Sequence, residues 1–400
     1  MRSTAVDDPF DLLGSVPDGS GPIWLHEGEG LVGVGEAARF EIDAGPGRFE
    51  RAQAELVSFF SSCEVHDEVH RLGSGPLAFG AFTFDRDAPG SALVVPQVVL
   101  GYREGHRWVT TVDGAEPPSL RASPPAAPTE RIRYAGSTMS ELRWLEIVAE
   151  AVDAIEDGKL DKVVLARDLL VWSKSGFDVR VLAGRLASRY PPCFTFAFDG
   201  LIGSTPELLV RRRSSAVESL VLAGSAPRGR DEAADEALGR ALLHSLKDLH
   251  EHRPAVESVR SVLSRLCSEL RADVKPYLFK LANVQHLATK LRGRLTSALS
   301  ALELAGALHP TAAICGTPTA TALDLIHSLE GMERARYSGP VGWVSASGDG
   351  EWGIALRCAE LTGSRCRLFA GSGIVKGSLP EAELEETRLK LRAMQAALES

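Results

Sequence analysis

The sequence predicts a large α+β fold built from layers of helices and strands (α/β layered), rather than a doubly wound parallel sheet. Three observations support this prediction. Helical patterns are interleaved with strand patterns without the regular alternation of a parallel sheet. The 400 residues are enough for one large unit or for up to three domains. The composition is that of a globular protein, with 44% hydrophobic and 24% charged residues.

Charge and cysteine usage exclude several classes of protein. The net charge is −9 and the basic residues are scattered, so nothing indicates binding to nucleic acid or to an anionic membrane. The six cysteines contain no C-x-x-C pair, and Asp7 and Asp8 stand where a signal peptide would be basic. We expect a cytoplasmic, monomeric protein with reduced thiols.

The first 130 residues show strand patterns around one helix. Residues 1–20 are rich in Asp, Gly, Ser and Pro and are expected to be loose. Short apolar runs over 23–42 and 77–112 predict strands, and helical spacing over 48–63 predicts a helix. Five prolines between residues 113 and 130 exclude a regular element and predict a linker or surface loop.

The rest of the chain has clearer elements. Thr138 stands three residues ahead of Glu141, which predicts a capping box and a helix that ends near Gly158. Periodicity predicts further helices at 179–190, 231–270, 297–308, 321–329 and 380–398. Apolar runs predict strands at 162–167, 194–198, 202–212, 218–222, 284–291, 342–345, 352–361 and 365–374.

Acidic residues recur at helical spacing in two places. Glu383, Glu386 and Lys390 share one face of the last helix, and Asp248 and Glu251 share one face of the central helix. On spacing alone, each is more typical of a solvated face. If the two faces met, their carboxylates would suit a hard divalent cation such as Mg²⁺.

Two further residues have both an ordinary and a catalytic interpretation. Lys162 opens an apolar strand, where it either extends its ammonium group to solvent or has a pKa lowered by burial. Glu207 follows a proline turn into a strand, as an edge carboxylate or as a proton donor. A base and an acid on neighbouring strands would suit an addition coupled to an elimination.

Glycines and isolated polar residues supply candidate binding groups. Segments 224–229 and 371–373 are expected to be tight turns, whose exposed N–H groups can cradle a carboxylate. Their spacing excludes a P-loop and a dinucleotide fingerprint. Arg357, on an apolar strand, is a candidate bidentate clamp for a carboxylate. His286 is more often a core histidine than a catalyst.

The order of these segments along the chain resembles that of the chorismate-utilising enzymes, and within them that of the isochorismate synthases. The resemblance covers residues 130–400 and is looser before that. It is carried by 162–167 (KVVLAR), 205–209 (TPELL), 222–225 (LAGS), 247–252 (KDLHEH), 309–311 (HPT), 342–343 (GW), 350–352 (GEW), 368–375 (LFAGSGIV) and 383–390.

The resemblance implies a fold of two large antiparallel-rich β-sheets packed face to face with helices outside. It also implies a single chorismate-binding catalytic domain over residues 21–400, in which 21–130 form a variable part and 131–400 carry the motifs. Residues 1–20 would remain a loose N-terminus.

The resemblance further implies a Mg²⁺-dependent reaction. Lys162 would activate water to attack C2 of chorismate, and Glu207 would protonate the departing C4 hydroxyl, giving isochorismate. Glu251 and Glu386 would hold Mg²⁺.

Further site residues follow from the same resemblance. Asp248 and Glu383 would support the metal, directly or through water. Arg357 and Lys390 would neutralise the substrate's carboxylates, and the glycine turns would supply backbone donors. The residues expected to bind substrate are Gly224, Ser225, His286, Ala313, Ile314, Tyr337, Arg357, Gly371, Gly373 and Lys390.

Small differences separate the subfamilies. The run Glu251–Val256 lacks the D-L-x-R-N-D pattern of anthranilate and aminodeoxychorismate synthases. Ala223 stands where the aminodeoxychorismate type has lysine, and Ala313 where amination enzymes and salicylate synthases have threonine. These differences favour isochorismate synthase, which would feed menaquinone or siderophore and salicylate biosynthesis.

Three alternatives stay open. A salicylate synthase would go on to eliminate pyruvate from isochorismate. An ammonia-using synthase would need a glutaminase subunit, which we do not expect as a partner. A catalytically silent chorismate-binding protein would have lost at least one of Lys162, Glu207, Glu251 and Glu386, all of which are present.

Overall fold

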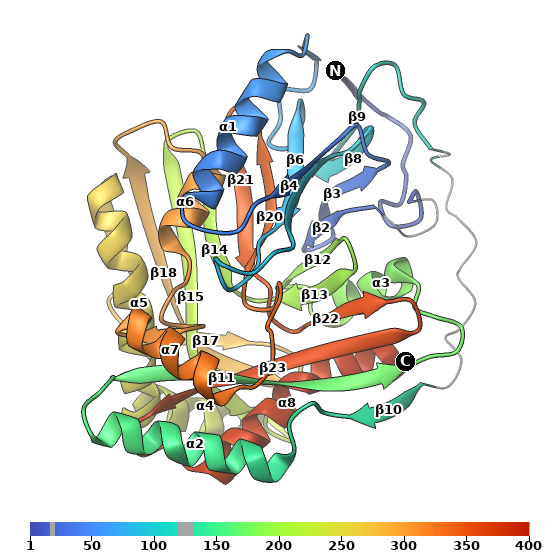
Figure 1. Cartoon of the computed structure of the whole chain (residues 1–400). Helices are drawn as coiled ribbons and strands as arrows, with labels where there is room; N and C mark the ends of the chain where they lie inside the picture. Colours follow the sequence, from blue (N-terminus) through green and yellow to red (C-terminus); the bar gives the residue numbers. More distant parts are fainter. Residues whose placement is uncertain (17–20, 119, 121–131, 400) are drawn as a thin grey trace.

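The computed structural model describes residues 1–16, 21–118, 120 and 132–399, which form two large sheets and eight helices in the described part of the chain (Figure 1). Neighbouring strands pair antiparallel throughout the described sheets except β1 with β5, which are parallel. None of the helices in these residues is long and apolar enough to cross a membrane.

The first sheet has 13 strands. In order across the sheet they are β10 (Arg133–Gly136), β11 (Lys162–Trp172), β23 (Arg365–Val375), β22 (Cys358–Thr362), β13 (Leu201–Thr205), β12 (Phe194–Phe198), β2 (Ile23–His26), β3 (Glu29–Val34), β8 (Val98–Arg103), β9 (His106–Thr111), β1 (Arg2–Ala5) and β5 (His66–Asp67), with β19 (Gly316–Thr317) beside β11.

The second sheet has ten strands. Their order is β16 (Cys267–Ala272), β18 (Val284–Leu295), β15 (Ala216–Pro227), β14 (Leu208–Arg213), β21 (Gly350–Ile354), β20 (Pro340–Ser345), β6 (Leu77–Ala81), β7 (Ser91–Val95) and β4 (Ala38–Ile42), with β17 (Tyr277–Lys280) beside β18. The helices are α1 (Arg48–Ser61), α2 (Glu141–Glu156), α3 (Val179–Arg189), α4 (Glu232–His244), α5 (Leu246–Leu266), α6 (Ala301–Leu308), α7 (Thr319–Leu329) and α8 (Pro380–Glu399).

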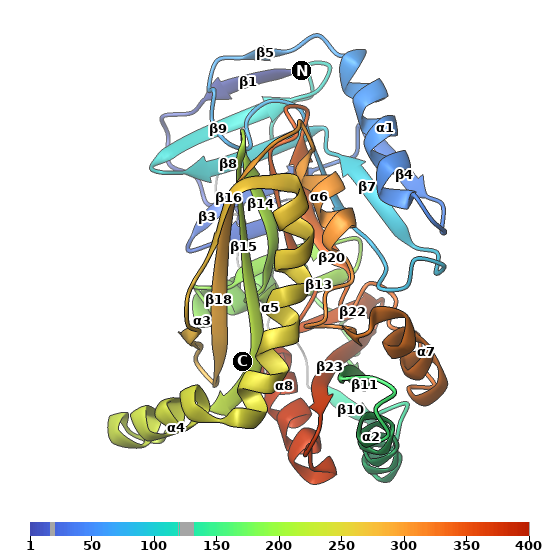
Figure 2. The same ribbon diagram turned by 90° about the vertical axis from the view of Figure 1, so that its left-hand side faces the viewer.

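Three apolar clusters hold these layers together. One joins the facing sides of the two sheets, with Trp24, Phe369 and Trp343 among its buried residues. The other two pack the helices against the outer sides, where α5 lies along β15 and β18 and α8 lies along β23 (Figure 2). The prediction of two antiparallel-rich sheets packed face to face with helices outside is confirmed.

Both sheets contain strands from before residue 112 and strands from after residue 132. On this ground we propose that residues 21–400 form a single domain. The expectation of a loose N-terminus is wrong for β1, which pairs with β9 and β5. Ser3 is buried there and its hydroxyl group shares a hydrogen bond with Thr110. Residues 17–20, and most of the expected proline-rich loop, lie outside the described residues.

Two predicted strands are each divided in two, because the chain passes from one sheet to the other within them. The expected strand 202–212 breaks at Pro206 into β13 and β14, since proline cannot donate a ladder hydrogen bond. The expected strand 352–361 breaks before Arg357 into β21 and β22. Arg357 has a φ of 49°, a left-handed conformation that is uncommon for a side chain of this size.

Two predicted helix boundaries are also wrong. Ser140, not Thr138, caps α2, because its side chain accepts from the N–H of Arg143. Thr138 instead donates to the buried carboxylate of Asp168. The helix expected over 231–270 is two helices, and Ser245 caps the second of them. Residues after Leu266 pair with β18 as β16.

A buried ion pair completes the edge of β11. The short strand β19 pairs only with the first two residues of β11. Beyond it, Glu330 accepts from the N–H of Ala166 at 2.8 Å, and Arg334 donates to the carbonyl oxygens of Val164 at 2.6 Å and Ile314 at 2.9 Å. Glu330 and Arg334 also pair with each other, at 2.9 Å between Nε and Oε2, and both are buried.

Arg334→Met should therefore lower the free energy of unfolding by about 3–5 kcal/mol, because it leaves the Glu330 carboxylate buried without its partner. Urea denaturation followed by circular dichroism measures this loss. Arg143→Met is the control, since Arg143 forms exposed ion pairs on α2 that contribute little. Equal effects of the two substitutions would contradict the role given to the buried pair.

Candidate active site

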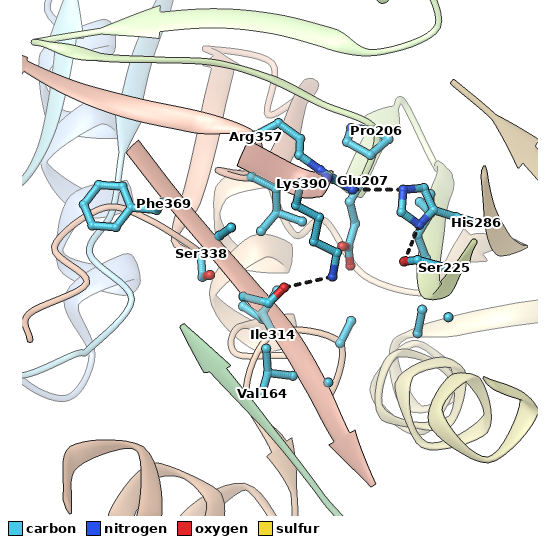
Figure 3. A pocket seen from close by; sticks show the side chains of 18 of the residues that line it. Val164, Pro206, Glu207, Ser225, His286, Ile314, Ser338, Arg357, Phe369 and Lys390 are labelled. Atoms are coloured by element: carbon cyan, nitrogen blue, oxygen red, sulfur yellow. Dashed lines mark hydrogen bonds between the residues drawn. The ribbon is translucent and has the colours of Figure 1, made fainter. Parts of the chain in front are cut away.

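A cavity lies where β11 and β23 of the first sheet approach β15 and β18 of the second (Figure 3). Helices α5 and α8 and four loops complete its walls. The lining residues are Val164, Pro206, Glu207, Leu222, Ala223, Gly224, Ser225, Glu251, His286, Ala313, Ile314, Tyr337, Ser338, Leu356, Arg357, Phe369, Ala370, Gly371, Gly373 and Lys390.

The structure brings most of the predicted site residues to this cavity. Those that line it are Glu207, Gly224, Ser225, Glu251, His286, Ala313, Ile314, Tyr337, Arg357, Gly371, Gly373 and Lys390. The four that do not are Lys162, Asp248, Glu383 and Glu386.

Sequence reasoning missed a set of mainly apolar lining residues. Their signal was position, because each lies within two residues of a predicted site residue. They are Val164, Pro206, Leu222, Ala223, Ser338, Leu356, Phe369 and Ala370.

Two of the crossovers between the sheets, from β13 to β14 and from β21 to β22, place Glu207 and Arg357 at the cavity. The crossover segments lie side by side, because Ile354 N–H donates to the carbonyl oxygen of Glu207 and Ser204 N–H donates to that of Arg357, both at 3.2 Å. Each of the two residues thus lies where the chain has left one sheet and has not yet joined the other.

The glycine segments line the cavity, but neither is a tight turn. Gly224 lies within β15, where the pairing with β18 shifts register between Leu222 and Ser225, and its φ is 82°. Such a bulge requires a residue that tolerates positive φ.

Gly371 and Gly373 lie in the middle of β23, paired with β11. Their partners in β11, Ala166 and Val164, direct their own backbone groups away from β23, and the carbonyl oxygen of Gly371 accepts from Lys390. These are therefore non-hydrogen-bonded pairs, and the N–H groups of Gly371 and Gly373 face away from β11.

Gly373 has a clear packing requirement. A Cβ atom at this position would lie 2.1 Å from Oε1 of Glu251 and 3.2 Å from Cε of Lys162. The missing side chain lets both groups reach the rim of the cavity. Lys162 therefore lies directly behind a lining residue, although it is fully buried itself.

The ammonium group of Lys162 is held by a single residue of α5. Its Nζ lies 3.5 Å from Oε1 of Glu251 and donates to the carbonyl oxygen of Glu251 at 3.3 Å. Burial lowers the pKa of Lys162, and the nearby carboxylates of Glu251 and Glu207 only partly oppose this effect. Such a lysine can lose its proton at a pH where an exposed lysine cannot.

Glu207 is shifted in the opposite direction. Its side chain is buried, and burial raises its pKa to about 8, against the opposing charges of Lys162 and Lys390. Glu207 is therefore protonated near neutral pH and can donate a proton into the cavity.

The predicted carboxylates of α5 and α8 come together at one end of the cavity. Burial raises the pKa of Glu251, and the carboxylates of Glu386 and Glu383 add to this. Glu386 is paired at 2.5 Å with Lys390, which holds its pKa below the usual range despite burial. Asp248 lies against Gly224, which lines the cavity.

The chemical type of these side chains suits a magnesium ion. Glu251 and Glu386 repel each other in a buried setting, which a divalent cation would relieve, and oxygen ligands are those that Mg²⁺ prefers. As they stand, no three acidic, histidine or cysteine side chains of the described residues are arranged as a metal cage. Two carboxylates are nevertheless enough for Mg²⁺ when water and substrate supply the other ligands.

His286 has a defined protonation state. Its Nε2 lies 3.0 Å from Nη2 of Arg357, and because a guanidinium only donates, Nε2 must be the acceptor. The proton is therefore on Nδ1, which lies 3.0 Å from the hydroxyl oxygen of Ser225 (Figure 3). Burial, and then the charges of Arg357 and Lys390, lower the pKa of His286 well below its usual value.

Comparison with known proteins identifies the family of this chain. The family model described as a chorismate binding enzyme matches residues 119–399. Isochorismate synthase DhbC of Bacillus subtilis is 37% identical over 343 residues, which cover 81% of this chain and 81% of that protein. Isochorismate synthase EntC of Escherichia coli is 35% identical, over 86% of this chain and 85% of that one.

A solved structure extends the likeness to nearly the whole chain. MenF, the menaquinone-specific isochorismate synthase from Escherichia coli, aligns with a TM-score of 0.82 and 26% identity, over 99% of this chain and 94% of that one. Because the family model covers well over half of the sequence, this chain belongs to the chorismate-binding enzyme family.

Proposed function

We propose that the protein is an isochorismate synthase, an isomerase of the hydroxymutase type that converts chorismate into isochorismate. The observation that carries this proposal is the pair Lys162 and Glu207, whose pKa values burial shifts in opposite directions at one cavity. A neutral lysine and a protonated glutamic acid are a base and an acid that can act together near neutral pH.

The two residues would act at different carbon atoms of the ring in a single displacement reaction, Lys162 at C2 and Glu207 at C4. Lys162 takes a proton from water as the water oxygen bonds to C2 of the ring. The ring double bonds shift, the bond from C4 to its hydroxyl group breaks, and Glu207 protonates the leaving oxygen as water. Solvent then returns the proton from Lys162 to Glu207, so that no net proton is consumed.

Two cationic side chains would bind the substrate's carboxylates. Arg357 is buried, and its Nη1 has no hydrogen-bond partner among the described residues, which suits an anionic oxygen in the cavity. Lys390 is fixed beside it by a hydrogen bond of 2.8 Å to the carbonyl oxygen of Gly371. His286 would orient Arg357 rather than transfer a proton.

Glu251 and Glu386 would hold Mg²⁺, with Asp248 and Glu383 in support. When bound, Mg²⁺ would supply a positive charge next to a substrate carboxylate, whose oxygen atoms can coordinate the ion. The side chains would then keep that carboxylate at the acidic end of the cavity, with the ring between Lys162 and Glu207.

We infer a cytoplasmic monomer acting without a glutaminase subunit, in menaquinone or siderophore and salicylate biosynthesis.

Incubation of the purified protein with chorismate and Mg²⁺ should give isochorismate, resolved by chromatography, without an aminated product. Lys162→Ala should reduce turnover about 100-fold or more, because it removes the base. Lys159→Ala is the control, since Lys159, three residues before Lys162, forms only an exposed ion pair with Asp157. Salicylate as the main product would move the protein to the salicylate synthases, and full activity of Lys162→Ala would refute the mechanism.

The pH dependence of kcat/KM should be bell-shaped. Activity rises with pH as Lys162 loses its proton, and it falls above about 8 as Glu207 loses its own. The fall in activity at high pH is the sharper test of Glu207. A glutamic acid with an unshifted pKa would already be ionised at every pH in this range and would produce no such fall. Activity that keeps rising through pH 9 would exclude Glu207 as the acid.

The imidazole of His286 should carry its proton on Nδ1 and should not titrate between pH 6 and 8. Nitrogen-15 NMR distinguishes the tautomers, and His286→Gln identifies the signal by its loss. His309 is an internal reference of the opposite tautomer, because its Nε2 donates to the carbonyl oxygen of Phe84 at 3.0 Å. A His286 signal that becomes doubly protonated near pH 6.5 would contradict this assignment.

A further inference from the structure

Lys247 lies beside the carboxylates of the proposed metal site, and the mechanism gives this lysine no role. Its Nζ lies 2.6 Å from Oε1 of Glu383, and this ion pair links the first turn of α5 to the first turn of α8. Figure 2 shows that α5 begins beside α8. The side chain of Glu383 is 1% exposed and that of Lys247 is 35% exposed, so the contact is open to solvent on one side only.

The charge of Lys247 acts on three of the four carboxylates of the proposed metal site. Glu383, Glu386 and Glu251 each raise its pKa, although burial opposes them, so Lys247 carries its positive charge at physiological pH. Lys247 and Glu251 are four residues apart on α5 and so share one face of that helix. A lysine ammonium is a compact point charge on a flexible stem, which allows it to leave a contact without disturbing the backbone.

Glu383 has a second partner that does not depend on Lys247. The hydroxyl group of Ser372, in β23, donates to the other carboxylate oxygen of Glu383. Glu383 would therefore keep its position if the lysine moved away. Only the lysine stem, which has an exposed side, needs to change conformation.

We propose that Lys247 is a built-in counter-ion that neutralises the acidic site in the metal-free protein and is displaced from Glu383 when a divalent cation binds. This inference rests on the proposed magnesium site and adds a regulatory device to it. The lysine stabilises the empty site against the mutual repulsion of its carboxylates, and the same charge weakens cation binding through competition. The site would consequently release Mg²⁺ more readily than its buried carboxylates alone would allow.

The test compares Mg²⁺ binding and stability in Lys247→Met. Calorimetric titration with MgCl₂ alone, at low ionic strength, should show affinity about fivefold higher than in the wild type, because no cation competes. In EDTA the variant should melt at a lower temperature than the wild type, and saturating Mg²⁺ should close that difference. Lys247→Arg, which keeps the charge, should bind Mg²⁺ no more tightly than the wild type.

Lys280→Met is the matched control. Lys280 also pairs with a helical carboxylate, Asp235, at 2.9 Å, and its side chain is 39% exposed. It should lose stability in EDTA without any gain in Mg²⁺ affinity. Weaker or unchanged binding in Lys247→Met, with normal binding in the wild type, would overturn the counter-ion while leaving the metal site intact. Binding in neither protein would remove the proposed metal site and this inference with it.

Discussion

The burial of opposite charges where the two sheets meet is the constraint on which the rest of this structure depends. Removing an isolated lysine or glutamate from water is costly, so each buried ion needs a partner or must become neutral. Lys162 and Glu207 respond by shifts of pKa toward their neutral forms. Glu386 and Glu383 are instead paired with lysines. One physical problem thus produces both the acid and base pair and the acidic end of the cavity.

Buried charged groups are brought together because the chain passes from one sheet to the other twice at the same place, from β13 to β14 and from β21 to β22. Glu207 and Arg357 occur at those crossovers, and backbone hydrogen bonds join the two segments. An arginine with a φ of 49° is unfavourable by itself and persists because the surrounding strands determine its position. The cavity is therefore a consequence of topology, and its polar groups come from residues far apart in sequence.

Local patterns predicted the elements better than their boundaries. The strand after Lys162 and the shared face of Glu383 and Glu386 follow from periodicity, but periodicity cannot tell that Thr138 is used by Asp168 and leaves the cap to Ser140. The crossovers were missed because a chain that changes sheets keeps its apolar pattern. The site residues came from the order of motifs and not from geometry. The counter-ion Lys247 lies in one of these motifs, but nothing in the sequence gave it a role, since a lysine four residues from a glutamate is typical of any exposed helix.

The protonation state of Lys162 tests the account most directly. Heteronuclear NMR of protein labelled at the lysine side chains, with Lys162→Met to identify the signal, gives the pKa of Lys162 itself. We expect it to titrate well below the exposed lysines, because burial outweighs the neighbouring carboxylates. Titration together with the exposed lysines would mean that Lys162 stays charged at neutral pH, and the proposed base and the logic of the buried cluster would both be wrong.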